Sequence, residues 1–317
     1  MAKILFSADW HIKLGQKNVP KDWQKNRFRL LYKELENIAD ENKVIAHVIG
    51  GDIFDSVPSL EEQELFVEFL VSTNIPTFIF DGNHEATRKG KTFFEQLKLT
   101  IEKLNPKVSV LLGPQHNILG VDMIPYTDLK TFNPKDFHNE ILLTHVRGNI
   151  EPHVKSEIDL ELFNRWDLVI AGDLHSHSNS QGNIVYPGSP MTVTFHRNKA
   201  KTGVIVFDNE HIECEWIPLH LPQLMRKTVE TEAEMVPTKY DHTIYELTGN
   251  IEELSKVQKA NPLLEKKVVK RVVESQIDFS NTKTMKEELT LYLKKVKGIE
   301  DVDKLLTVYN DIIKEQE

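Results

Sequence analysis

The stretch KILFSADWH, residues 3–11, places two side chains of the metal-ligand type directly behind a short apolar segment. We expect residues 3–7 to form a strand, which Asp9 and His11 follow. Because these two residues are two positions apart, extended backbone directs both side chains to one face, where they can hold one cation. A single Asp-x-His motif arises by chance in many chains, so its meaning depends on what the rest of the sequence adds.

The rest of the chain predicts a layered α/β core. Apolar strand patterns alternate with helical spacing up to about residue 104, and Ser59 with Glu62 forms a capping box that opens one helix. After about residue 107, closely spaced strands with few helices between them predict a second sheet packed on the first. We expect strands over residues 3–7, 44–49, 76–80, 108–112, 118–124, 141–145, 168–171, 203–207 and 212–216, and helices over 23–39, 60–73 and 93–104.

Four further segments place ligand-type residues at or directly after expected strands. They are Gly50-Gly-Asp52, Asp81-Gly-Asn83-His84-Glu85, Thr144-His145 and Gly172-Asp173-Leu174-His175. In open α/β sheets, sites form at the carboxyl ends of the strands. Two divalent cations roughly 3.5–4 Å apart need a shared anionic ligand, together with neutral N and O ligands. Asp52 is the natural shared ligand and Asn83 supplies an uncharged oxygen, which leaves His84 free for another role.

Taken together, these motifs carry a family resemblance. The set DxH, GGD, GNHE, a later histidine and a closing GxxH resembles the calcineurin-like metallophosphoesterase superfamily over roughly residues 1–217. The segments GDIFDSVPS (51–59) and YPGSP (186–190) are similar to those of SbcD-type nucleases, relatives of the meiotic-recombination nuclease, in the compact versions that bacteriophages encode. The resemblance implies a two-sheet α/β sandwich flanked by helices over 1–220, a small α/β capping domain over 221–280 and a C-terminal helical hairpin over 281–317.

The resemblance also implies a set of ligands for two cations. One cation would be held by Asp9, His11, Asp52 and His175, and the other by Asp52, Asn83, His145 and the residue at position 173.

Position 173 departs from the family pattern, which is Gly-His-x-His. Two registers compete: Asp173 replaces the first histidine and His175 remains the second, or the pair slips by two residues to His175 and His177. Gly172 directly follows the expected strand, as the motif requires, and this favours the first register. Because a carboxylate suits hard, oxygen-preferring ions, we expect Mn²⁺ or Mg²⁺ rather than zinc, with Mn²⁺ first.

The activity that the resemblance implies is metal-dependent hydrolysis of DNA phosphodiesters, by exonuclease or endonuclease cleavage, in DNA recombination, repair and replication. His84 would act as general acid or transition-state stabiliser. Two alternatives stay open. One is a small-molecule phosphodiesterase or phosphomonoesterase of the same superfamily. The other is a catalytically silent scaffold, a reading to which the substitution at Asp173 lends some support.

The resemblance further implies partners. SbcD-type nucleases act with an SMC-like ATPase that binds their C-terminal helices, here about residues 284–316, whose apolar faces are equally explained by packing on the chain's own domain. They also form homodimers through core helices, here 60–73 and 91–104, where the apolar residues are equally explained by packing on the sheet.

Composition limits where the protein works and how it meets DNA. With a net charge of −9, the chain needs a local basic face or metal ions to approach phosphates. Arg88, Lys89, Arg197 and Lys199 are candidates near the mouth of the site, with solvated surface charge as the plainer explanation. The single cysteine, the lack of a signal-peptide pattern and the absence of a long apolar stretch make us expect a protein of the bacterial or phage-infected host cytoplasm, away from membranes.

Overall fold

The computed structural model describes residues 2–87, 91–257, 261–270, 284–295, 297, 299, 302 and 304–307. Its strands are β1 Lys3–Ser7, β2 Ala46–Gly50, β3 Thr77–Phe80, β4 Val108–Val110, β5 Gln115–Ile118, β6 Val121–Ile124, β7 Ile141–His145, β8 Leu168–Gly172, β9 Ile184–Val185, β10 Thr202–Asp208, β11 Glu213–Leu219, β12 Leu224–Val229, β13 His242–Gly249 and β14 Leu264–Val269. Its α-helices are α1 Lys21–Asn42, α2 Leu60–Ser72, α3 Phe94–Leu104, α4 Ile251–Lys256 and α5 Met285–Lys295.

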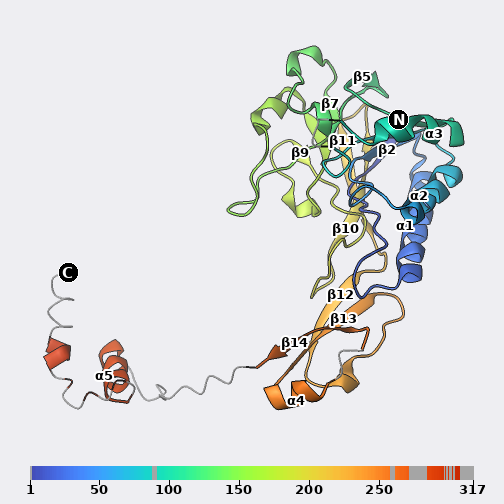
Figure 1. Ribbon diagram of the computed structural model, residues 1–317. Helices are drawn as coiled ribbons and strands as arrows, with labels where there is room; N and C mark the ends of the chain where they lie inside the picture. Colours follow the sequence, from blue (N-terminus) through green and yellow to red (C-terminus); the bar gives the residue numbers. More distant parts are fainter. Residues whose placement is uncertain are drawn as a thin grey trace.

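These strands form three sheets within the described residues (Figure 1). The six-stranded sheet has the order β11-β10-β1-β2-β3-β4, with β1 to β4 parallel and β10 antiparallel to β1. The five-stranded sheet has the order β5-β6-β7-β8-β9, with β6 to β9 parallel. The expected α/β architecture, with two sheets flanked by helices, is confirmed.

One expected strand is wrong. Residues 118–124 do not form a single strand, because the chain turns back between β5 and β6. Leu119 and Gly120 both have positive φ, 57° and 75°, which is the backbone of a two-residue type I′ turn. The sequence pattern missed this turn because leucine is not a typical turn residue.

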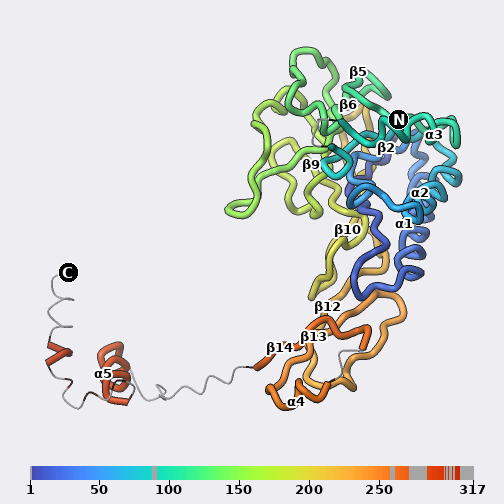
Figure 2. The backbone as a smooth tube through the Cα atoms, in the orientation of Figure 1, coloured from blue at the N-terminus to red at the C-terminus, as the bar shows by residue number. Residues whose placement is uncertain are grey.

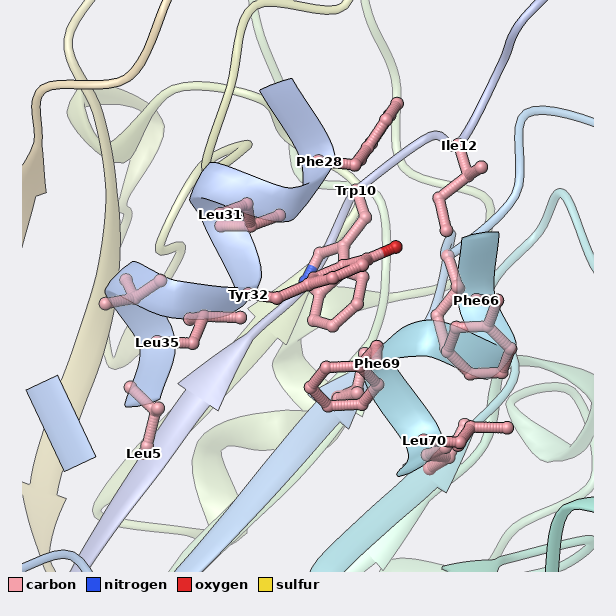
Figure 3. Close-up of a cluster of buried hydrophobic side chains, with 14 of the residues drawn as sticks. Leu5, Trp10, Ile12, Phe28, Leu31, Tyr32, Leu35, Phe66, Phe69 and Leu70 are labelled. Atoms are coloured by element: carbon pink, nitrogen blue, oxygen red, sulfur yellow. The ribbon is translucent and has the colours of Figure 1, made fainter. Parts of the chain in front are cut away.

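The central strands are buried on both faces, which explains their continuous apolar runs. Leu5 of β1 belongs to a cluster with Phe28 of α1 and Phe69 of α2 on the helical side of the six-stranded sheet (Figure 3). Its neighbours Ile4 and Phe6 face the other way and join the apolar layer between the two large sheets. The two sheets are therefore held face to face, with their strand ends side by side.

His47 lies outside the motifs and is a core histidine. Its Nε2 lies 2.8 Å from Ser7 Oγ, which also accepts a hydrogen bond from Trp10 Nε1 at 3.0 Å. Burial lowers the pKa of His47 to about 3, so the ring is neutral at physiological pH. These buried contacts among His47, Ser7 and Trp10 support the loop that carries Asp9 and His11.

The three-stranded sheet follows the two large sheets along the chain (Figure 2). Its strands are parallel, and α4 packs on it through Leu254. A bridge between His196 and Met225 of β12 joins it to the segment that precedes β10. In the same figure, α5 lies apart from the sheets, and it contains no buried residue. Among the described residues, no helix has the length and apolar character that crossing a membrane requires.

Candidate metal centre

The ligand-type residues converge where strand ends of both large sheets meet. Asp9 and His11 follow β1, Asp52 follows β2, Asn83 and His84 follow β3, His145 ends β7, and Asp173 and His175 follow β8. Strands β2 and β7 contact each other across the sandwich. Segments that lie far apart in the sequence therefore form one site at the carboxyl ends of parallel strands.

The backbone of this site is strained at four of the expected ligands. Asp9, His11, Asp52 and Asp173 have φ values of 57°, 47°, 52° and 101°. Residues with side chains rarely occupy this left-handed region, and such conformations cluster at functional sites. Two backbone hydrogen bonds hold two of these loops together, from Asp9 N to Gly51 O at 3.1 Å and from His11 N to Asp52 O at 2.9 Å.

Two glycines permit the close approach of the loops. Gly51 has a φ of +87°, and a Cβ there would lie 2.7 Å from His145 Nδ1. A Cβ on Gly172 would lie 2.5 Å from the same nitrogen and 2.7 Å from Gly50 O. No side chain fits at either position without moving the expected ligand His145.

One half of the site brings two histidines together. His11 Nε2 lies 3.0 Å from His175 Nε2, and it lies 3.7 Å from Asp52 Oδ2. His175 Nε2 lies 4.0 Å from Asp9 Oδ1. Adjacent ligands of a cation with bonds of 2.0–2.1 Å lie about 3 Å apart, so the two ring nitrogens fit one metal ion between them.

The other half of the site centres on Asn83. The end of its amide that faces the centre lies 3.0 Å from His145 Nε2 and 2.9 Å from Asp52 Oδ2. His145 Nδ1 lies 2.8 Å from Gly50 O and donates its proton there, so Nε2 can present a lone pair to a metal ion. If this atom is the amide oxygen of Asn83, its neighbours His145 Nε2 and the Asp52 carboxylate are hydrogen-bond acceptors too. A cation placed between these atoms would bind all of them. Rotated by 180°, the amide would instead donate N–H to the same atoms.

The electrostatics of the site favour a cation. Burial raises the pKa of Asp9 well above its usual range, and nearby Asp52 and Asp173 raise it further. Burial also lowers the pKa of His145, but the same three carboxylates outweigh this effect and raise it to about 9. Burial and the neighbouring His11 lower the pKa of His175 to about 4. Buried carboxylates crowded in this way attract positive charge, which divalent cations supply.

Two residues inside the quoted motifs have roles that the sequence analysis did not assign. The buried Glu85 carboxylate accepts hydrogen bonds from the backbone N–H of Asp52, Gly82 and Phe54, at 2.8, 2.9 and 3.0 Å, and joins the loops after β2 and β3. The carbonyl oxygen of Asp55 lies 2.6 Å from His84 Nδ1 and orients that ring. Glu85 is the last residue of the GNHE motif and Asp55 the last residue of GDIFD, so both residues lay within motifs that the sequence analysis quoted.

Arg147 is a third residue that the sequence analysis missed, and no motif pointed to it. Its Nε and Nη2 each donate to a different oxygen of Asp173, both at 3.1 Å. Asp173 Oδ1 in turn lies 4.0 Å from His145 Nε2. The expected ligand Asp173 is thus in contact with a guanidinium on one side and faces the centre on the other.

His177 lies away from the centre. Its ring stacks on Trp216, with centroids 5.0 Å apart, and its Nδ1 lies 2.7 Å from Tyr186 O. His175, by contrast, contacts His11. The structure therefore brings the residues of the first register to the centre, and His177 serves to attach this loop to the YPGSP segment.

A cleft of about 1050 Å³ opens over the centre and extends along residues 189–202. The basic side chains that line it are Arg147, Lys155 and Lys201, with His84, His153, His175, His177 and His196. Of the residues expected near DNA, Arg197 is ion-paired with the buried Glu246, and Lys199 lies 3.2 Å from Asp241. Arg88 and Lys89 lie outside the described residues.

Comparisons with known proteins agree with this geometry. The family model for calcineurin-like phosphoesterases matches residues 2–178. A protein of Escherichia phage T5 named "Probable exonuclease subunit 1" is 40% identical over 315 residues, which cover 96% of each chain. A subunit of the SbcCD nuclease of Staphylococcus saprophyticus is 22% identical over 268 residues, which cover 68% of this chain and 69% of that protein. With these matches and a metal-ligand cluster at the strand ends, the chain belongs to the calcineurin-like phosphoesterase family of metal-dependent hydrolases.

Proposed function

We propose that the protein is a two-metal DNA nuclease that hydrolyses phosphodiesters as the nuclease subunit of an SbcCD-type complex. The kinship to the phage T5 exonuclease subunit over nearly the whole chain supports a nucleic-acid substrate. We place its activity in DNA end processing during recombination, repair or replication. Since the DNA of a bacterium or its phage lies in the cytoplasm, we place the enzyme there as well.

The observation that carries the proposal is the charge of the cleft. The chain has a net charge of −9, but within the described residues the only carboxylates that line the cleft are Asp52 and Asp173, both expected metal ligands. The basic groups Lys155 and Lys201 line the same surface, beside Arg147, whose charge is paired with Asp173. A basic cleft in an acidic protein favours binding of a nucleic-acid phosphate backbone. The cleft also extends from the metal centre along residues 189–202, which is more surface than a small phosphomonoester requires.

We assign the ligands as the sequence predicted. Asp9, His11, Asp52 and His175 would hold one cation, and Asp52, Asn83, His145 and Asp173 the other, with Mn²⁺ favoured because oxygen ligands predominate in the second set. When bound, the cations would activate water and neutralise charge on the phosphate. His84 lines the cleft, and its Nε2 lies 3.9 Å from Asp52 Oδ2. Because Nδ1 donates to the Asp55 carbonyl, His84 would act as general acid in its imidazolium form, which carries a second proton on Nε2 that it can give to the departing sugar oxygen.

The first test is an activity assay of the purified protein with Mn²⁺. We expect cleavage of linear duplex DNA, and loss of that cleavage when EDTA removes the metal and its return when Mn²⁺ is restored. Single-stranded DNA and a chromogenic phosphodiester are the comparison substrates. Turnover of phosphomonoesters without any cleavage of DNA would favour the small-molecule phosphoesterase instead, and no turnover of any substrate would favour the silent scaffold.

We also propose that α5 and the residues after it bind the SMC-like ATPase. The apolar side chains Met285, Tyr292 and Leu305 are 71%, 38% and 45% exposed. Exposed apolar residues at helical spacing are typical of a helix that docks on a partner. Removal of residues 271–317 should abolish co-purification with the ATPase while the protein alone still cleaves DNA, and unchanged association would contradict this assignment.

A homodimer through the core helices is a further part of the proposal. The exposed residues Leu60 and Val71 of α2 and Leu99 of α3 are 82%, 64% and 64% accessible. They lie on the outer sides of helices whose inner faces pack on the six-stranded sheet. Apolar side chains on adjacent helices that packing on the sheet leaves uncovered support an interface with a second copy.

A further inference from the structure

We propose that Arg147 balances the charge of Asp173, so that the Asp173–Arg147 pair takes the place of a neutral histidine ligand in the metal centre. The inference rests on the proposed metal centre, and it adds a residue that determines how tightly the centre binds its cations. Arg147 does not itself act as a ligand, since a guanidinium has no lone pair to offer.

The geometry of the pair is specific. The two N–H groups of Arg147 donate to the two oxygens of Asp173 at equal distances of 3.1 Å, the parallel bidentate arrangement. The Asp173 side chain is only 5% exposed, and its own backbone N–H donates to both Asp9 oxygens, at 3.1 and 3.2 Å. Asp173 is thus fixed at both ends, with Oδ1 4.0 Å from His145 Nε2.

Arg147 is itself held from behind. Its Nη1 lies 3.5 Å from Glu157 Oε1, and Glu157 accepts a hydrogen bond from the Tyr126 hydroxyl at 2.6 Å. Groups that contact a metal ligand from outside orient it and tune the affinity for the metal. The chain Tyr126–Glu157–Arg147–Asp173 has this arrangement and ends at the expected second cation.

Charge explains why an arginine accompanies this aspartate. A histidine at position 173 would be a neutral ligand, whereas Asp173 adds one negative charge beside Asp9 and Asp52. Arg147 adds one positive charge in contact with it, so the pair as a unit is neutral. The Asp173–Arg147 pair then contributes the same net charge as a neutral histidine ligand, although the ligand atom has changed from nitrogen to oxygen; Glu157 adds its negative charge on the other side of Arg147.

The test measures Mn²⁺ binding by isothermal titration calorimetry, without DNA, at fixed pH and ionic strength. Arg147→Met removes a positive charge that repels a cation at the centre, so we expect Mn²⁺ to bind about tenfold more tightly. Asp173→His removes a negative charge that attracts the cation, so we expect binding about tenfold weaker. The double variant restores the net charge and should bind within about threefold of the unchanged protein. Arg147→Lys keeps the charge without the bidentate contact and is the matched control, also expected within about threefold.

Equal or weaker Mn²⁺ binding by Arg147→Met, or a double variant that binds no better than Asp173→His, would overturn the inference. If Arg147→Met does not fold, as thermal unfolding would reveal, the comparison of Asp173→His with the double variant still decides. Failure of the proposed function has a different signature, because an unchanged protein that binds Mn²⁺ but cleaves no DNA contradicts the function and leaves the pair's role in metal binding standing.

Discussion

Asp52→Asn should lower the rate of DNA cleavage by at least roughly 10³-fold, since the cations supply several kcal/mol of transition-state stabilisation. Asp52 Oδ2 lies between the two halves of the site, 3.7 Å from His11 Nε2 and 3.5 Å from His145 Nε2. No other carboxylate of the described centre approaches the histidines of both halves so closely. Asparagine keeps the shape of the side chain but removes the charge that two cations would share.

Two measurements check this expectation. Initial rates on end-labelled duplex DNA give the loss of turnover, and calorimetry with Mn²⁺ gives the number of ions bound per chain, which should fall below two. The matched control is Asp167→Asn, which makes the same chemical change at an exposed residue in the loop before β8 and should leave both quantities unchanged. An Asp52→Asn protein that still binds two Mn²⁺ ions would show that another residue joins the two sites.

His84→Ala should behave in the opposite way, with Mn²⁺ binding retained and turnover on DNA reduced by about 10²–10⁴-fold. His84 contacts the Asp55 carbonyl, and its Nε2 lies no closer than 3.9 Å to Asp52 Oδ2, so its loss leaves the expected ligand set in place. What the variant loses is the proton for the departing sugar oxygen.

The leaving group gives a sharper version of this test. A chromogenic phosphodiester releases nitrophenolate, which departs without being protonated, so the effect of His84→Ala should be much smaller on that substrate than on DNA. His138→Ala, which removes an exposed histidine from the same domain, is the control and should cleave both substrates normally. An equal loss on both substrates would mean that His84 stabilises the phosphate rather than protonates the leaving group.

Local patterns predicted the parts of the fold that depend on neighbouring residues. The strand Lys3–Ser7 was predicted to the residue, and the helix that follows Ser59 begins where the capping box with Glu62 indicated. The hairpin at residues 115–124 was not predicted, because its turn uses the positive φ of Leu119, for which leucine has no preference.

In the candidate site, too, local sequence patterns predicted some residues and missed others. Short motifs identified the expected metal ligands that the structure gathers at the strand ends, since each motif joins a buried strand to a ligand within a few positions. Arg147 could not be found like this, because its partner Asp173 is 26 residues away and lies on a different loop. The sequence likewise could not show which charged residues are paired. Arg197 was a candidate for contact with DNA, but in the folded protein it forms an ion pair with Glu246 of β13.

The sequence by itself therefore determined the layered α/β core of the first half of the chain, and its motifs carried the resemblance from which the family and the candidate ligands follow, because motifs and apolar periodicity are local properties of the chain. Only the tertiary structure decided which charges are paired, that His177 stacks on Trp216 rather than joining the centre, and which basic groups line the cleft. The physical reason is that a charge interacts with what lies within a few ångströms of it, and those neighbours come from segments that only folding brings together.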